Sequence, residues 1–354
     1  MSYLNNGKHL ISEPRVSEDA SDTVSKSDRS NSTNTSQGVR VPRRQSTASI
    51  RPVSVASSIF SVIPFSCQDR YSKIVSAIEL RDVQALRELA ISDGGLLNTN
   101  LRRKAWPLLL NVDSFYMYKH HDTPHRDEHQ VDIDLTRTNL PRMAGCVLSS
   151  ELRKRVQKQL GNVVKTILRA HPWLSYYQGF HELAMVFLII LNGGNDSLRA
   201  TESAALFFVR DAMGDNLETI RTQLSLIYTL LENEDPELHT LLDQLAIPPF
   251  FAISWVLSWF AHDLVDLNDM ARLYDFFMSS SPLAPIYVAA SLVSHNRSKI
   301  LGSEPEFAVV HALLVGLPQG NNDWAEILAR SSEWMEEYPL ARLQELGNVK
   351  LNKK

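Results

Sequence analysis

From Arg70 onward, apolar residues recur at intervals of three and four positions, which is the period of a helix with one buried face. The first such stretch runs from Ile74 to Leu89 and closes at Gly94 and Gly95. Glycine pairs commonly follow the end of a helix. We therefore expect a short helical hairpin at the start of the ordered chain.

A longer apolar stripe begins after Ser149 or Ser150, either of which can cap a helix, and Pro172 ends it. The stripe consists of Leu152, Val156, Leu160, Val163, Val164, Ile167 and Leu168. Away from the stripe, the helix carries a cationic row of Arg153, Lys154, Arg155 and Lys158. Such a row can steer an acidic partner, but a solvated helix face is the more usual explanation.

The remainder of the chain also has the apolar spacing of helices. Leu183 to Leu191 is almost purely apolar and ends at Asn192-Gly193-Gly194, which predicts a buried helix. Further helices are expected near 201–213, 217–233, 236–246, 250–263, 269–280, 284–298, 305–316 and 324–338. No alternating strand pattern and no fixed repeat appear, so we predict an all-α fold, arranged as one multi-helix body or as two helical lobes.

The first 65 residues differ from the rest. They are rich in Ser, Thr and Asn and show no sustained period, so we expect a disordered tail. Arg43 and Arg44 precede Ser46 there, which could suit a basophilic kinase, although an incidental arginine pair is the simpler reading. We place the folded domain at residues 70–345 and a short polar tail at 346–354.

Composition narrows the function classes. The net charge is −4 over 354 residues, which argues against nucleic acid as the main partner. The two cysteines, Cys67 and Cys146, are too few for a disulfide framework and lack metal-ligand spacing, so a cytoplasmic setting fits. No apolar run approaches the roughly 18 residues of a membrane span, and no signal peptide is present.

Histidines cluster before the first polar motif. His121, His125 and His129 are four apart and would align on one helix face, as zinc ligands sometimes do. Pro124 lies inside the run and would break such a helix. We expect a solvated loop and no metal site.

Two short polar stretches stand out against this helical background. Arg137 lies within 130–138, and Gln178 lies within 173–183. A guanidinium is a planar cation with five donors, which suits phosphate, and an amide can hold a water through one donor and one acceptor. GTP hydrolysis needs such a pair, because charge spreads over the γ-phosphate oxygens while water attacks in line. We predict that Arg137 and Gln178 lie on a shared face and act together.

Simpler explanations exist for both residues. Asp134 lies three positions before Arg137, so its carboxylate is expected to fix the direction of the guanidinium. The same pair could be a surface ion pair worth at most about 1 kcal/mol. Asp132 could compete for Arg137, and Gln178 could simply cap the helix that follows Gly179.

A third pair, Arg102 and Trp106, is four residues apart and shares one face of a predicted helix over 102–110. A cation packed on an indole at the edge of a core is one explanation. A role near the functional site is the other.

These motifs together resemble those of TBC-domain Rab GTPase-activating proteins. Val131-x-x-Asp134-x-x-Arg137 is similar to the Ile-x-x-Asp-x-x-Arg motif of that family, and Tyr176-Tyr177-Gln178 is similar to its Tyr-x-Gln motif. Arg102-x-x-x-Trp106 matches its Arg-x-x-x-Trp box, and Arg272-Leu273-Tyr274-Asp275 resembles its Arg-Ile-Trp-Asp segment. All four occur in family order, and the resemblance covers roughly residues 70 to 345.

The resemblance implies a catalytic activator acting in trans on a GTP-bound Rab GTPase, without substrate turnover of its own. Arg137 would be an arginine finger and Gln178 a glutamine finger, with Asp134, Tyr176, Arg102 and Trp106 in support. The protein would need no cofactor, because GTP and Mg²⁺ belong to the GTPase.

Tyr176 to Glu182 and Ser254 to His262 most resemble the endoplasmic-reticulum subgroup of the family. That likeness implies a Rab one type GTPase of endoplasmic-reticulum-to-Golgi traffic, with a Rab eighteen type as second candidate, and a place in the cytoplasm at those membranes. The subgroup carries a C-terminal membrane anchor, whereas this chain ends at Lys354, so we expect a truncated or soluble form with at most peripheral membrane association.

Two rival functions remain open. A Rab-binding or scaffold module of membrane trafficking would bind the GTPase without accelerating hydrolysis. A helical scaffold unrelated to GTPases would do neither, but it leaves the ordered motifs as coincidence.

Overall fold

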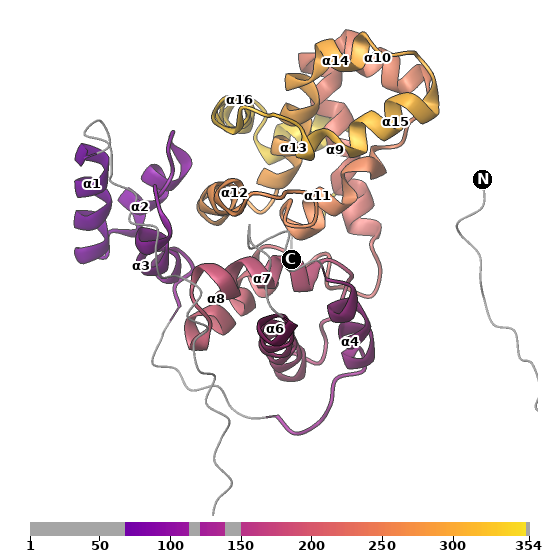
Figure 1. Cartoon of the computed structure of the whole chain (residues 1–354). Helices are drawn as coiled ribbons and strands as arrows, with labels where there is room; N and C mark the ends of the chain where they lie inside the picture. Colours follow the sequence, from indigo (N-terminus) through magenta and orange to yellow (C-terminus); the bar gives the residue numbers. More distant parts are fainter. Residues whose placement is uncertain (1–67, 113–120, 139–149, 352–354) are drawn as a thin grey trace, which may run out of the picture. The chain divides into compact units, whose positions relative to one another are not determined.

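Helices make up all the regular secondary structure of residues 68–112, 121–138 and 150–351, which are the residues that the computed structural model describes (Figure 1). They lie in one compact unit, Ala48–Lys354. The all-α prediction is therefore confirmed for this part of the chain. The predictions for residues 1–65 and 352–354, Ser46 included, lie outside the described residues.

The first three helices are α1 (Gln68–Glu79), α2 (Val83–Ile91) and α3 (Thr99–Leu109). α1 and α2 form the expected hairpin. Asp82 caps α2 by accepting from the amide of the third helical residue, and Asn98 caps α3 by accepting from two amides of its first turn. These caps satisfy backbone donors that would otherwise lack partners.

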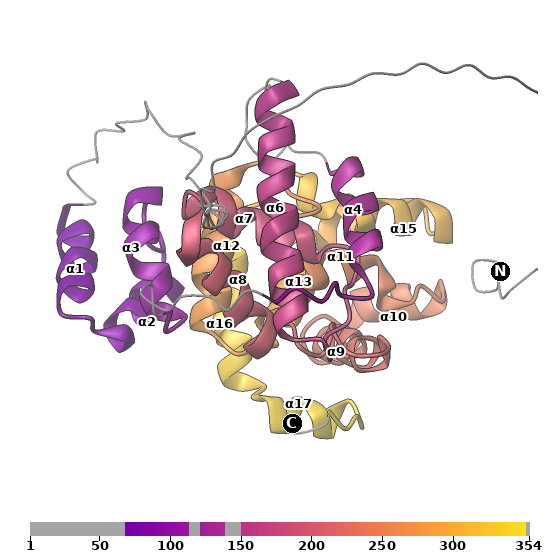
Figure 2. The same cartoon turned by 90° about the horizontal axis from the view of Figure 1, so that it is seen from below.

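The middle of the chain holds α4 (Glu128–Arg137), α6 (Ser150–Ala170), α7 (Phe180–Ile190) and α8 (Gly194–Phe207). Nine of the eleven residues of α7 are buried, as its apolar sequence predicts. α6 packs against α4, α7 and α8, and Figure 2 shows α4 beside α6 with α6 continuing past it. The buried α7 thus forms the base on which α4 and α6 rest.

The C-terminal half is built around α13, which packs against both α9 and α16. Its elements are α9 (Glu218–Glu234), α10 (Pro236–Gln244), η2 (Pro249–Ala252), α11 (Ile253–Ser258), α12 (Leu267–Ser279), α13 (Ala284–His295), α14 (Arg297–Leu301), α15 (Phe307–Val315), η3 (Leu317–Gln319), α16 (Trp324–Glu337) and α17 (Leu340–Leu346).

The helix predicted over 250–263 is wrong in its second half. α11 ends at Ser258, and Trp259 and Phe260 take left-handed backbone angles, with φ of 53° and 64°. Both side chains are fully buried, Trp259 against Tyr274 and Phe277. Left-handed angles are costly for bulky residues, so burial of the two rings holds the turn in place.

Two other boundaries also differ from the prediction. α8 begins at Gly194, whereas the sequence suggested a start near Thr201, because Gly193 takes a positive φ and serves as the cap of α8. The helix expected over 284–298 divides at Asn296 into α13 and α14. In both places a residue that commonly ends a helix lies between two consecutive helices.

Among the described residues, no single helix is long and apolar enough to cross a membrane. Taken together, α10 and the segment Pro249–Ser258 reach the length and apolar composition of a membrane span. The chain bends by 111° between them.

Candidate functional site

Arg137 is the last residue of α4 and its side chain is exposed. A cation at the C-terminal end of a helix interacts favourably with the helix dipole. Within the part of the chain that the structure describes, no hydrogen bond or ion pair holds its guanidinium. The arginine is therefore fixed through its backbone while its charged group is available.

Asp134 does not bind Arg137, contrary to the expectation from spacing. Its carboxylate is buried, at 3% exposure, and accepts hydrogen bonds from the Tyr176 hydroxyl at 2.9 Å and the Gln130 amide at 2.9 Å. Asp132 does not compete either, since it pairs with Lys165 at 2.7 Å. Asp134 shares the buried face of α4 with its apolar neighbours, whereas Arg137 comes off the exposed side.

Tyr176 joins α4 to the start of α7. Its hydroxyl lies 2.9 Å from Asp134 Oδ2 and 2.7 Å from His181 Nδ1. Because the single hydroxyl proton is donated to Asp134, the Nδ1 proton of His181 is donated to the hydroxyl oxygen. Burial lowers the pKa of His181, which keeps the ring neutral, and burial with the Asp134 charge raises the pKa of Tyr176. The chain of hydrogen bonds is therefore intact at neutral pH.

The turn that carries Gln178 is anchored on both sides of that residue. Tyr177 is buried and donates its hydroxyl to the carbonyl of Leu257 at 2.8 Å. Gly179 follows with φ of 113°, a value that residues other than glycine rarely adopt, and it is the N-cap residue of α7. The amide of Tyr176 donates to Asp127 at 2.8 Å.

Gln178 itself is exposed, and it makes no hydrogen bond with the described residues. Two links join its turn to α4, the Tyr176 hydroxyl on Asp134 and the Tyr176 amide on Asp127. Asp134 is three residues from Arg137, and Tyr176 is two from Gln178. The structure therefore brings the two polar stretches into contact, and each presents one exposed polar side chain that has no hydrogen-bond partner among the described residues.

α4 is held along α6 by ion pairs. Glu128 receives two hydrogen bonds from Arg169, at 2.6 and 2.7 Å. The hydrogen bond from Arg169 lowers the pKa of Glu128 to about 2. Nearer the end of α4, Gln157 donates to the carbonyl of Leu135 at 2.8 Å.

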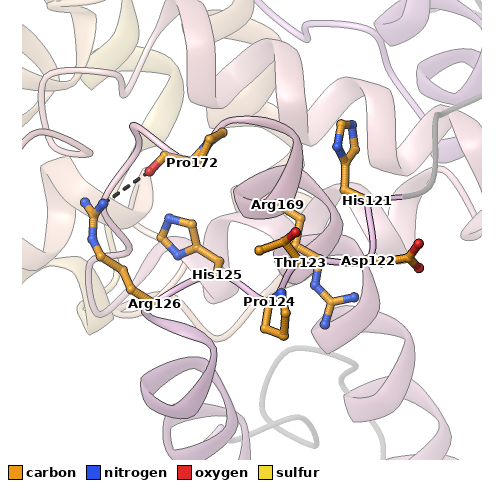
Figure 3. A pocket seen from close by; sticks show the side chains of 8 residues that line it. All are labelled: His121, Asp122, Thr123, Pro124, His125, Arg126, Arg169 and Pro172. Carbon is orange, nitrogen blue, oxygen red and sulfur yellow. Dashed lines mark hydrogen bonds between the residues drawn. The ribbon is translucent and has the colours of Figure 1, made fainter.

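An open pocket of about 670 Å³ lies at the other end of α4, before its first turn (Figure 3). Its lining consists of His121, Asp122, Thr123, Pro124, His125, Arg126, Arg169 and Pro172. Arg126 ties this loop to the Gln178 turn by donating to the carbonyl of Pro172 at 3.2 Å, as Figure 3 shows, and to Ser175 at 2.7 Å.

The histidines do not share one helix face. His121 and His125 lie in the loop before α4, and only His129 is helical. In the described ranges, no group of three or more His, Cys, Asp or Glu side chains could hold a metal ion. The loop predicted for this segment is confirmed from 121 to 127.

Arg102 and Trp106 meet at a carboxylate and do not stack on one another. Arg102 donates to Asp275 from Nε and Nη2, at 3.0 and 2.9 Å to Oδ2, and the Trp106 indole donates to Oδ1 at 2.7 Å. The amide of Leu96 completes the set at 3.0 Å. Trp106 also packs against Phe187 of α7. The pair thus supports the base of the site through α7 and α12, and Figure 1 shows α3 on the far side of α7 from α4.

Sequence reasoning gave no structural role to three residues that hold the site together: Asp127, His181 and Asp275. Asp275 lies in one of the family motifs, and its role could have been found, because a carboxylate inside the apolar run from Leu273 to Met278 requires a buried partner. No such signal indicates the roles of Asp127 and His181. Their roles depend on where the Gln178 turn lies on α4.

The arrangement presents a cation and an amide from two segments that are locked together. A free guanidinium can bind phosphate oxygens bidentately, and a free amide can orient a water. The pair suits stabilisation of a reaction that takes place on another molecule.

The sequence is similar to those of known proteins. Residues 99–301 match the model of the Rab-GTPase-TBC domain. TBC1 domain family member 20 of Bos taurus is 33% identical over 75% of this chain and 66% of its own length, and the Homo sapiens protein is 32% identical over 74% and 65%. The GTPase-activating protein gyp10 of Schizosaccharomyces pombe is 29% identical over 71% and 68%. The chain thus spans slightly less than two thirds of the first two relatives.

Solved structures share the fold. The crystal structure of the Ypt/Rab-GAP domain of Gyp1p aligns with a TM-score of 0.58 at 16% identity, over 75% of this chain and 99% of that domain. The Chlamydomonas flagellar RabGAP TBC domain aligns with a TM-score of 0.53 over 82% and 97%. Because the family model covers more than half of the sequence, the chain belongs to the Rab-GTPase-TBC domain family.

Proposed function

We propose that this protein accelerates GTP hydrolysis by a Rab-family GTPase, with Arg137 as an arginine finger and Gln178 as a glutamine finger supplied in trans. The observation that carries the proposal is the pair of exposed side chains on two segments joined through Tyr176 and Asp134. Family membership and the GTPase-activating relatives support it.

In this proposal the guanidinium of Arg137 stabilises charge that develops between the β- and γ-phosphates. The amide of Gln178 orients the attacking water in place of the glutamine of the GTPase. GTP and Mg²⁺ are brought by the partner, so the activator contributes position and charge only. Because both side chains arrive on anchored segments, little ordering is required at the moment of reaction.

The expected substrate is a GTP-bound Rab one type GTPase of endoplasmic-reticulum-to-Golgi traffic, with a Rab eighteen type second. The likeness to TBC1 domain family member 20 supports this choice. We also propose action in the cytoplasm at those membranes, and the same likeness supports this location.

Single-turnover GTP hydrolysis across a panel of purified Rab proteins tests the proposal. Arg137→Ala should lower the stimulated rate by on the order of 10³- to 10⁵-fold while binding persists. Arg137→Lys should fail as well, because an ammonium lacks the planar fork. Gln178→Ala should also lose stimulation. Lys104→Ala, at an exposed position of α3, is the charge-removing control.

Three outcomes separate the candidate functions. Stimulation that depends on both fingers supports the activator. Binding without stimulation indicates a Rab-binding module, and neither binding nor stimulation indicates an unrelated scaffold. Full stimulation by Arg137→Ala would exclude Arg137 as a finger.

A further inference from the structure

Two ion pairs join α4 to α6, and the two helices run in opposite directions. Glu128 pairs with Arg169 at 2.6 Å, and Asp132 pairs with Lys165 at 2.7 Å. Each step of four forward on α4 matches a step of four backward on α6. All four side chains therefore lie along one seam between the helices.

These ion pairs stop before the end of α4. The next contacts are uncharged: Gln157 donates to the carbonyl of Leu135, and a Cβ added at Gly161 would lie 2.9 Å from Leu135 Cδ1. The last turn of α4, which ends at Arg137, therefore lies beside residues 157–161 of α6. Figure 2 shows that α6 extends further.

The α6 side of the seam remains cationic beyond the ion pair of Asp132 and Lys165. Lys158 and Lys154 precede Lys165 by seven and eleven residues, spacings that return to the same side of a helix. Both are exposed, and neither forms a hydrogen bond or ion pair with any residue that the structure describes. Arg153 and Arg155 fall on other sides of α6 by the same spacing.

We propose that Lys154 and Lys158 form a cationic strip that binds an acidic segment on the surface of the GTPase, next to its nucleotide site. The inference rests on the proposed function and adds a recognition surface to it. α4 neutralises one part of the seam with Glu128 and Asp132, and its last residue is the exposed Arg137. A partner that seats Arg137 at its phosphates lies close to Lys158 and Lys154, because the last turn of α4 lies beside residues 157–161 of α6.

A protein partner fits the strip better than a lipid surface. Adsorption to anionic membranes typically uses four to eight clustered cations, whereas the strip has two lysines beside the end of the helix that carries the proposed finger. The strip also stands out against a chain whose net charge is −4. Charges at the rim of an interface act mainly on encounter and orientation, so the strip should affect binding of the GTPase and leave the chemical step unchanged.

The test is the double variant Lys154→Glu/Lys158→Glu in the full chain, with Lys104→Glu/Lys299→Glu as the matched control. The control lysines are exposed on α3 and α14. For the Rab that the unaltered protein stimulates most, the strip variant should raise KM about tenfold near 50 mM salt with kcat unchanged. The difference should shrink near 300 mM salt, where screening is stronger. The control should follow the unaltered protein.

Each outcome decides a separate point. If the unaltered protein stimulates no Rab, both the proposed function and the strip fail. If it stimulates a Rab but the strip variant keeps the same KM and salt dependence, the strip alone is wrong. If the variant keeps its KM and instead loses binding to phosphatidylserine vesicles, the lysines serve a membrane and the inference is overturned.

Discussion

At the scale of single residues, Tyr176 is the point where the segments that carry Arg137 and Gln178 meet. Its hydroxyl contacts both Asp134 and His181, and its amide is held by Asp127. The side chains of Arg137 and Gln178 themselves have no partner to orient them among the described residues. Their placement therefore depends on the tyrosine behind them.

Tyr176→Phe removes the hydroxyl and leaves a buried carboxylate one donor short. We expect a loss of about 1–3 kcal/mol in the free energy of unfolding and a fall of about tenfold in stimulated hydrolysis, because a small displacement of a catalytic group is costly. Urea denaturation and single-turnover assays measure the two effects. Tyr228→Phe, which removes a hydroxyl bonded to the carbonyl of Ile247, should lower stability only. Equal activity losses in both variants would contradict the positioning role.

Sequence reasoning identified the exposed pair at this scale but misassigned its neighbour. Spacing allowed Asp134 to reach Arg137, yet the carboxylate lies on the buried side of α4 and binds Tyr176. Spacing within one helix cannot show which tertiary partner lies nearer. The contact between residues 134 and 176 depends on how the turn before α7 packs, which no local pattern records.

At the scale of elements, the alignment of α4 on α6 depends on Glu128 and Arg169. The pKa of Glu128 falls from 4.5 to about 2 because of the hydrogen bond with Arg169. A carboxyl with a lower pKa in the folded state stabilises the fold above its unfolded pKa. This stability is lost as the pH falls through the folded pKa.

Glu128→Gln should remove this contribution. In the unaltered protein, the free energy of unfolding should decline between about pH 5 and pH 2, with a share on the order of 1–2 kcal/mol from this pair after allowance for solvent screening. The variant should lack that share of the decline and be less stable at pH 7. Urea titrations at several pH values provide the measurement. Glu218→Gln, which removes an exposed helical ion pair with Arg221, is the control. Parallel pH curves for Glu128→Gln and the unaltered protein would refute the assignment.

Most helices were predictable from apolar spacing, and the failures have local causes. Gly193 was taken as the end of a helix, whereas its positive φ lets it begin the next one. Trp259 and Phe260 fit a helical stripe by spacing but form a left-handed turn, because tertiary burial of both rings outweighs the backbone cost. Such reversals depend on the shape of the surrounding core.

At the scale of the whole molecule, Asp275 is a centre that joins three segments. It is fully buried and receives bonds from Arg102, Trp106 and the amide of Leu96. Asp275→Ala would leave the Arg102 guanidinium, only 4% exposed, without its counter-charge. We expect a loss of about 3–5 kcal/mol in the free energy of unfolding, measured by urea denaturation.

The matched control removes both charges. Arg102→Met/Asp275→Leu should recover the part of the loss that comes from the unpaired charge, while the Trp106 indole and the Leu96 amide still lack their acceptor. If the single and double variants were equally unstable, the unpaired charge would not be the main cause of the loss. The family motifs marked Arg102, Trp106 and Asp275 individually, but only the folded chain shows that they form one cluster.

The same cluster has a consequence for biosynthesis. Arg102 and Asp275 are separated by 173 residues, and chains grow at about 5–20 residues per second. On that basis α3 would wait about 9–35 s after its synthesis before its carboxylate partner is made. During this interval the apolar face of Trp106 has no α12 to cover it. In the nascent protein, the N-terminal helices should therefore stay open to chaperones and proteases until α12 has been made.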